Sequence, residues 1–161
     1  MKLAQKGRLR KGFRTEKGSS IAEFGPALFL LFFFALFPAI DLIGIGMSYL
    51  SCVALNDLQV REAVRVPKSQ AIDPKGTVQL AIPEKWRPTV LGGLGGTIEP
   101  PTTEVSYIKG KRVMYVNVAT TCTMNPILTI PFFVRVPGLG APFVTTINHS
   151  RVIENPMFYM Q

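Results

Sequence analysis

Only a few side chains of this 161-residue protein could carry out chemistry, and they form no catalytic set. His149 is the single histidine, so a metal site with several histidine ligands cannot form. No serine or cysteine has a nearby motif that would supply a base to activate it. The glycines of residues 91–97 lack the Gly-Lys-Ser/Thr ending of a phosphate-binding loop. We therefore expect no enzyme activity, no metal site and no other cofactor.

The two cysteines, Cys52 and Cys122, are too few and too far apart in the sequence for a zinc site. In an oxidising compartment they could form a disulfide that ties a strand to a helix. Alternatively, they are two separate buried thiols that pack as small apolar groups. The sequence leaves both alternatives open.

Two acidic residues, Glu23 and Asp41, stand at the two ends of an uncharged apolar run. A second uncharged stretch follows Asp41 and covers residues 42–56. About 20 apolar residues are enough for a helix to cross the ~30 Å hydrocarbon core of a bilayer. Residues 24–48 are therefore predicted to form a transmembrane helix.

Basic side chains are concentrated before this apolar run. Residues 1–18 carry seven basic residues and one acidic residue, whereas the other 143 residues carry 11 basic and nine acidic residues. The body therefore has no basic face for a nucleic-acid backbone, although the whole chain has a net charge of +8. The positive-inside rule predicts a cytoplasmic N-terminus and an exported C-terminal body. The run is longer than the core of a cleaved signal peptide, so we expect an anchor.

Residues 17–24 (KGSSIAEF) resemble the processing site of type IV prepilins. In that family a membrane peptidase cleaves after a glycine, which would be Gly18, so that Ser19 becomes the first residue of the mature chain. A glutamate then occupies the fifth mature position, as Glu23 does, and a long apolar helix follows. A small first residue such as Ser19 is usual in the tight-adherence (Tad) branch of the family.

A second acid narrows the resemblance. Residues 21–24 (IAEF) and 39–41 (AID) are similar to the N-terminal signature of TadE-like pseudopilins, in which an acid–phenylalanine pair, an apolar span with proline and a second acid follow one another. Residues 137–143 (PGLGAPF) and 151–154 (RVIE) loosely resemble the end of that domain. Major Tad pilins are much shorter than this chain and TadG-type proteins are longer, so a TadE-like minor pilin fits best by size.

This resemblance implies a partner for Glu23, namely the N-terminal amine of an adjacent subunit or of the same subunit. A buried carboxylate is tolerated when it is paired, so Glu23 would make misaligned assembly unfavourable. Alternatively, Glu23 lies solvated among the cytoplasmic headgroups and has no such role. Asp41 should lie about 27 Å further along a continuous helix, near the outer headgroups, where it is either a second functional acid or an interfacial acid that needs no partner.

The remaining pattern predicts an α+β fold, with a long N-terminal helix followed by a small antiparallel β-sheet domain. Helical periodicity continues as far as Val66, and Pro67 ends it. We divide the chain into a basic leader (1–18), the helix with its extracytoplasmic extension (19–66) and a β-rich domain (67–161). Alternating apolar residues predict strands at 77–82, 104–108, 112–120 and 144–153, and residues 127–136 are expected to form an edge strand or an extended loop.

Together these features predict a minor pilin, a structural and assembly component of a tight-adherence type IV pilus. Its expected partners are other pilin and pseudopilin subunits, the prepilin peptidase, the inner-membrane assembly platform and the membrane, and not nucleic acid. It would cross the bacterial inner membrane once, with a periplasmic body, before entering a surface pilus. The alternative is a signal-anchored extracytoplasmic binding domain of an envelope or secretion complex, which would keep residues 1–18.

Overall fold

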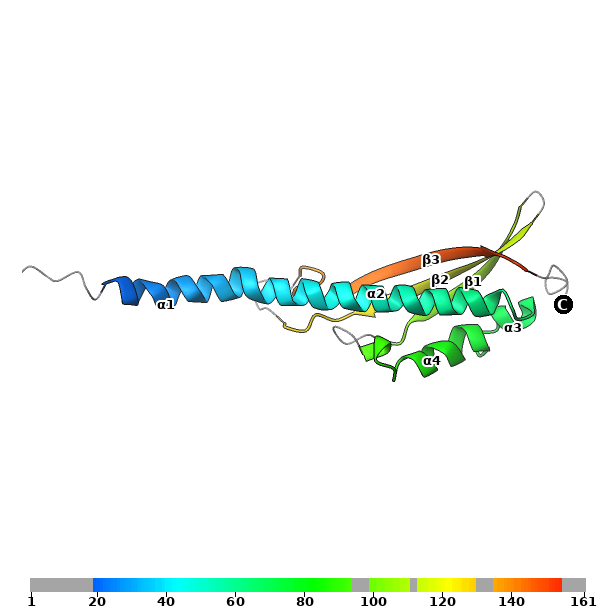
Figure 1. Ribbon diagram of the computed structural model, residues 1–161, viewed down its shortest axis with the longest axis horizontal. Coiled ribbons are helices and arrows are strands. Elements are labelled where there is room, and N and C mark those ends of the chain that lie inside the picture. The colour runs from blue at the N-terminus through cyan, green and yellow to red at the C-terminus, as the bar shows by residue number, and fades with distance from the viewer. Residues whose placement is uncertain (1–18, 94–98, 111–112, 130–134, 155–161) are drawn as a thin grey trace, which may run out of the picture.

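The structure, a computed structural model, describes residues 19–93, 99–110, 113–129 and 135–154. Figure 1 shows a long helical rod whose second half carries a small sheet and several short helices. The rod is continuous and consists of α1 (Ser19–Leu31), the π-helix η2 (Phe32–Leu36) and α2 (Phe37–Ala63). The predicted α+β fold, with a long N-terminal apolar helix and a small antiparallel sheet, is therefore confirmed.

A proline explains why the rod contains a π-helical turn. Pro38 has no N–H group, so it cannot bond to the carbonyl of Phe34 as the α-helical pattern requires. The chain widens locally, and the N–H of Phe37 donates to the carbonyl of Phe32, five residues earlier. The helix therefore continues through the proline. At its other end, the N–H of Val66 still bonds to the carbonyl of Glu62 at 3.1 Å, next to the predicted boundary at Pro67.

Three strands form one antiparallel sheet in the order β1-β2-β3, comprising β1 (Thr102–Lys109), β2 (Met114–Met124) and β3 (Phe143–Val152). They correspond to the strands predicted at 104–108, 112–120 and 144–153. β2 is longer than predicted because its last residues, Thr121–Met124, pair with the first residues of β3. In the segment 127–136, the described residues lie outside all three strands.

The strand predicted at 77–82 is wrong. Residues Thr77–Ala81 form the π-helix η3, and Ile82–Trp86 form the short helix α4, after α3 (Lys68–Ile72). A strand would place Val78 and Leu80 on the same face, but Val78 is fully buried and Leu80 is exposed. The buried residues Val78 and Trp86 are instead two helical turns apart, so this segment packs beside α2 with a helical period.

The core lies between the inner face of the sheet and one face of α2. Alternate residues of β2 are buried, from Val116 through Val118 to Met124. On α2 the buried positions recur every three or four residues, which is the period of a helix with one covered face. These positions are Asp41, Gly44, Ile45, Ser48, Ser51, Cys52, Leu55, Asn56, Gln59, Val60 and Ala63.

Two buried amides hold the sheet at one position along α2. The Nδ2 group of Asn56 donates to the carbonyl of Val118 at 3.0 Å, to Oγ1 of Thr120 at 2.9 Å and to the carbonyl of Ile147 at 3.2 Å. One turn later, Nε2 of Gln59 donates to Oγ1 of Thr103 at 2.8 Å, and its Oε1 accepts from the Thr120 hydroxyl at 2.7 Å. The network joins α2 to all three strands, so it fixes both the position and the orientation of the sheet.

We predict that Asn56→Ala destabilises the domain by about 2–3 kcal/mol, because it leaves buried acceptors on two strands without their donor. Chemical unfolding of the full-length protein in detergent, followed by circular dichroism, measures this loss. The matched control is Asn117→Ala on the exposed face of β2, where the amide bonds to the hydroxyls of Ser106 and Ser150. The control should cost less than about 1 kcal/mol. Equal losses in the two variants would contradict the role given to Asn56.

Candidate functional site

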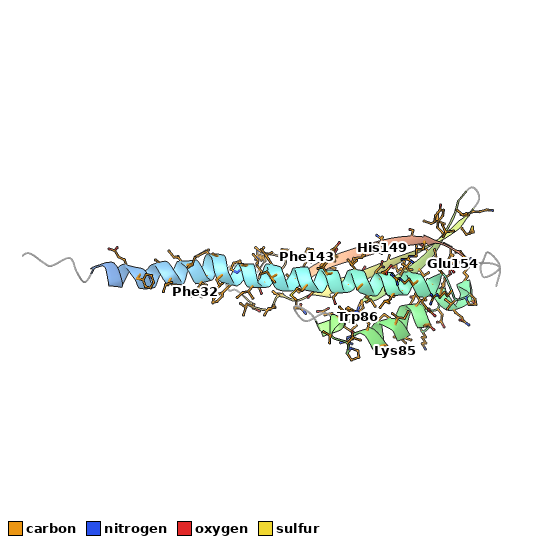
Figure 2. The ribbon with its side chains drawn as sticks, in the orientation of Figure 1. Phe32, Lys85, Trp86, Phe143, His149 and Glu154 are labelled. Atoms are coloured by element: carbon orange, nitrogen blue, oxygen red, sulfur yellow. The ribbon has the colours of Figure 1, made fainter. Side chains whose placement is uncertain are left out.

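The candidate site is the uncovered surface of the N-terminal helix. From Glu23 to Ile40, none of the side chains is buried, and large apolar residues such as Phe24 and Phe34 are more than half exposed. Figure 2 shows Phe32 on this part of the rod, away from the sheet and the short helices. At a rise of about 1.5 Å per residue, the bare stretch is about 27 Å long, close to the ~30 Å hydrocarbon core of a bilayer. The helix from Glu23 to Ala63 is long and apolar enough to cross a membrane.

Beyond Ile40 the same helix is covered on one face only. The predicted membrane segment, 24–48, therefore overlaps the folded body, which begins to cover the helix at Asp41. The opposite face remains open and apolar, with Leu42 60% exposed and Leu50 68% exposed. We call this face the uncovered stripe, and it consists of Leu42, Ile43, Met47, Leu50 and Leu58. The candidate surface thus includes the whole circumference of the helix from Glu23 to Ile40. Beyond Ile40 it is limited to the uncovered stripe beside the folded domain.

The structure places the predicted processing and registration residues only in part. Gly18 lies outside the described residues. Ser19 is the first residue of α1, and Glu23 lies one helical turn later, in an exposed position. Glu23 and Asp41 are about 27 Å apart along the helix, so they cannot act on one group.

Asp41 does not have the environment that the sequence suggested. It is fully buried, whereas an interfacial acid without a partner would be solvated. Its Oδ1 accepts a hydrogen bond of 2.8 Å from the backbone N–H of Leu128, which belongs to the connection between β2 and β3. The other oxygen, Oδ2, has no hydrogen-bond partner in the part of the chain that the structure describes. Asp41 therefore holds its own subunit's β2–β3 connection against the helix.

A second contact confirms how closely this connection approaches the helix. Gly138 has φ of 87°, a conformation that favours glycine, and a Cβ atom there would lie 2.7 Å from Cδ1 of Ile45. Ile45 lies one helical turn beyond Asp41. The β2–β3 connection thus touches the helix at two successive turns, at Asp41 and Ile45. These turns lie where the exposed part of the helix ends and the part covered by the domain begins.

The structure brings the two cysteines together. Cys52 on α2 and Cys122 on β2 are both fully buried in the same apolar cluster, and both are free thiols that hydrogen-bond to each other. This hydrogen bond lowers the pKa of the Cys122 thiol, while burial acts in the opposite direction. The two cysteines are therefore neighbours in the core, and both are buried free thiols in this structure.

A cavity of about 540 Å³ lies between α2 and α4. Trp86 is only 4% exposed and belongs to the same core cluster as the cysteines. Figure 2 shows Trp86 and Lys85 on α4, beside α2. Apolar residues make up much of the lining, and Arg61, Arg65 and Lys85 are also among the lining residues. The cavity could receive an apolar side chain.

Sequence reasoning missed the contact between Asp41 and Leu128. The donor is a backbone N–H group 87 residues away, and any residue except proline could provide it. Comparisons with protein-family models, with curated proteins and with solved structures found no match to this chain. The exposed surface of the N-terminal helix and the residues at its two ends therefore carry the functional inference.

We predict that Asp41→Ala releases the β2–β3 connection from the helix. Loss of the side-chain acceptor should speed hydrogen exchange at the Leu128 amide by up to about 10-fold, since a hydrogen bond contributes about 0.5–1.5 kcal/mol. Hydrogen–deuterium exchange with peptide-level mass spectrometry measures this change. Asp41→Asn keeps an oxygen acceptor and should protect the amide nearly as well. Unchanged exchange at Leu128 in Asp41→Ala would contradict the assignment.

Proposed function

We propose that this protein is a TadE-like minor pilin, a structural and assembly subunit of a tight-adherence type IV pilus. In this proposal the bare helix anchors the subunit in the bacterial inner membrane with a cytoplasmic N-terminus and a periplasmic body. A prepilin peptidase removes residues 1–18, and the assembly platform then transfers the mature subunit into the filament. The observation that carries the proposal is the uncovered helix surface, which starts beside Glu23 and continues along the folded body.

The uncovered stripe favours an assembly subunit over a simple anchor. An anchor needs apolar residues only where it crosses the lipid, yet Leu50 and Leu58 lie about 15 Å and 27 Å beyond Ile40 along the helix. Both side chains are exposed, next to the water-facing domain. Covering a leucine side chain contributes about 1.5–3 kcal/mol, so a neighbouring helix laid along this stripe would stabilise an assembled bundle. A monomer anchored in lipid gains nothing from it.

The exposed helix surface from Glu23 to Ile40 can be covered first by lipid and later by neighbouring helices. In the membrane, lipid tails are as apolar as the phenylalanines and leucines of the helix, so there is little hydrophobic drive for premature association. Outside the membrane the same 27 Å of helix would face water, at a large cost, unless other helices surround it. This property fits a subunit that is stored in a membrane and then moved into a helical bundle.

Glu23 gives such a bundle its alignment. An isolated carboxylate in an apolar environment costs roughly 2.5–3.5 kcal/mol at the centre of a membrane helix, which a positive partner would offset. Cleavage after Gly18 would create an amine on Ser19, one helical turn before Glu23. In a bundle of parallel subunits, the Ser19 amine of one subunit and Glu23 of a neighbour meet only at a particular axial offset. Incorrect offsets would leave both charges unpaired.

The second candidate is a signal-anchored extracytoplasmic binding domain of an envelope or secretion complex, and the cavity between α2 and α4 favours it. Such a protein would keep its basic N-terminal segment as a cytoplasmic anchor, and Glu23 would have no role in assembly. The fate of residues 1–18 therefore separates the two candidates.

We predict that the mature protein begins at Ser19. Cleavage after Gly18 would place Glu23 at the fifth mature position. Intact-mass spectrometry of protein purified from its native host should show loss of residues 1–18, and Gly18→Leu should block that loss because the peptidase requires the glycine. A full-length mass for the wild-type chain, in cells that process other prepilins, would exclude the pilin proposal.

We further predict that Glu23→Gln and Glu23→Ala are processed and inserted normally but are lost from filaments. Removing the carboxylate lowers the cost of insertion and deletes the partner of a neighbouring amine. Sheared filaments and membranes are compared by immunoblotting. Glu84→Gln, the same change at an exposed acid on α4, is the control and should be incorporated like the wild type. Equal incorporation of Glu23→Gln and the control would refute the registration role.

A further inference from the structure

We propose that Cys52 and Cys122 form an intramolecular disulfide in the exported protein, and that this bond fastens β2 to α2. The inference depends on the proposed function in one respect, namely export of the body into an oxidising compartment. The placement of the two cysteines is independent of that function.

The buried amide network is the first evidence, because it aligns the two cysteines. Asn56 lies one helical turn beyond Cys52 and bonds to Thr120 at 2.9 Å. Cys122 is the next residue after Thr120 on the same face of β2. One helical turn of four residues rises about 6 Å, and two strand residues span about 6.6 Å. Val60 of α2 packs in one cluster with Val116 and Val118, whereas Cys52 packs in another cluster with Cys122. The strand therefore runs antiparallel to the helix, and Cys52 is placed opposite Cys122.

The immediate surroundings agree with this alignment. Both thiols are 0% exposed and hydrogen-bond to each other. They lie in an apolar cluster with Leu55, Trp86 and Met124, and within the described residues no cluster of three or more His, Cys, Asp or Glu side chains could hold a metal with them. Two adjacent thiols with no metal partner and no other polar task are suited to a structural cross-link.

The burial of the thiols determines when the bond forms. An oxidant cannot reach either sulfur once the sheet covers α2, so oxidation must precede closure of the core. One cysteine loses its proton and attacks a disulfide of an oxidised thiol–disulfide exchange protein, which gives a mixed disulfide. The second cysteine, also as a thiolate, attacks the mixed disulfide and displaces the reduced oxidant. Two protons and two electrons leave the pair, and the oxidant becomes a dithiol.

In the proposed pilus subunit, the long helix is the part that is withdrawn from lipid, so the attachment of the sheet to this helix matters. The chain between the cysteines contains α3, η3, α4 and β1, so the bond closes a loop of about 70 residues. Cys52 lies three turns beyond Asp41, near the end of the domain that faces the bare helix. A covalent bond there would keep the sheet attached to α2 while the helix is withdrawn from lipid.

The first test is alkylation of the full-length protein in its host membranes. N-ethylmaleimide is added under denaturing conditions, with and without prior reduction, and the intact mass is measured. We expect no adduct on the unreduced protein, a mass lower by two hydrogen atoms, and two adducts after reduction. Two adducts on the unreduced, exported protein would overturn the proposal. A bonded protein that retains residues 1–18 would refute the pilin function alone, whereas a processed protein with two free thiols would refute the disulfide alone.

The second test does not depend on the cellular compartment. Purified full-length protein is refolded in detergent with reduced and oxidised glutathione, and its thermal midpoint is measured before and after reduction. Closing a loop of this length should raise the midpoint by on the order of 10 °C in the chain-entropy model. The double variant Cys52→Ala/Cys122→Ala should show no response to reductant. Formation of only glutathione adducts or intermolecular dimers would also overturn the proposal.

Discussion

The side-chain amide of Asn56 reaches acceptors on β2 and β3, and the position of the whole domain along the helix depends on these bonds. The apolar contacts alone would allow the sheet to slide, because one helical turn is close in length to two strand residues. A slide would leave the amide and its acceptors buried without partners, at a cost of about 1–3 kcal/mol for each group. With Asn56 fixed, Cys52 meets Cys122, and the β2–β3 connection reaches the helix at Asp41.

Much of this fold was predictable because it depends on local periodicity. The long helix and the three strands follow from apolar residues spaced for a helix or a strand. The segment 77–82 was not predictable, because alternating apolar residues in so short a run fit a helix turn as well as a strand. Its helical state was determined by packing beside α2, where Val78 and Trp86 are buried and Leu80 is not.

The residues of the candidate site also fall into those that the sequence alone identifies and those that depend on packing. Glu23 and the apolar run were identified from residue types in order along the chain, which a sequence displays directly. The environment of Asp41 was not, since its partner is a backbone N–H group that leaves no signature in the sequence. The cysteines fall between these cases. The sequence left open whether Cys52 and Cys122 form a disulfide or are separate buried thiols. The alignment of α2 and β2 through Asn56 places the two cysteines next to each other.

Asp41 also limits how deeply the proposed anchor can enter a membrane. Moving the helix further into lipid would carry the β2–β3 connection with it, because Leu128 and Gly138 are held against this part of the helix. Irregular backbone is not tolerated in hydrocarbon, where its polar groups would lose water without gaining partners. Moving the helix outward would expose apolar side chains near Ile40 to water. The carboxyl group of Asp41, buried by its own subunit at this boundary, thus couples the depth of the anchor to the position of the folded body. In the proposed pilin, the uncovered stripe would then be presented to neighbouring subunits at a fixed height above the membrane.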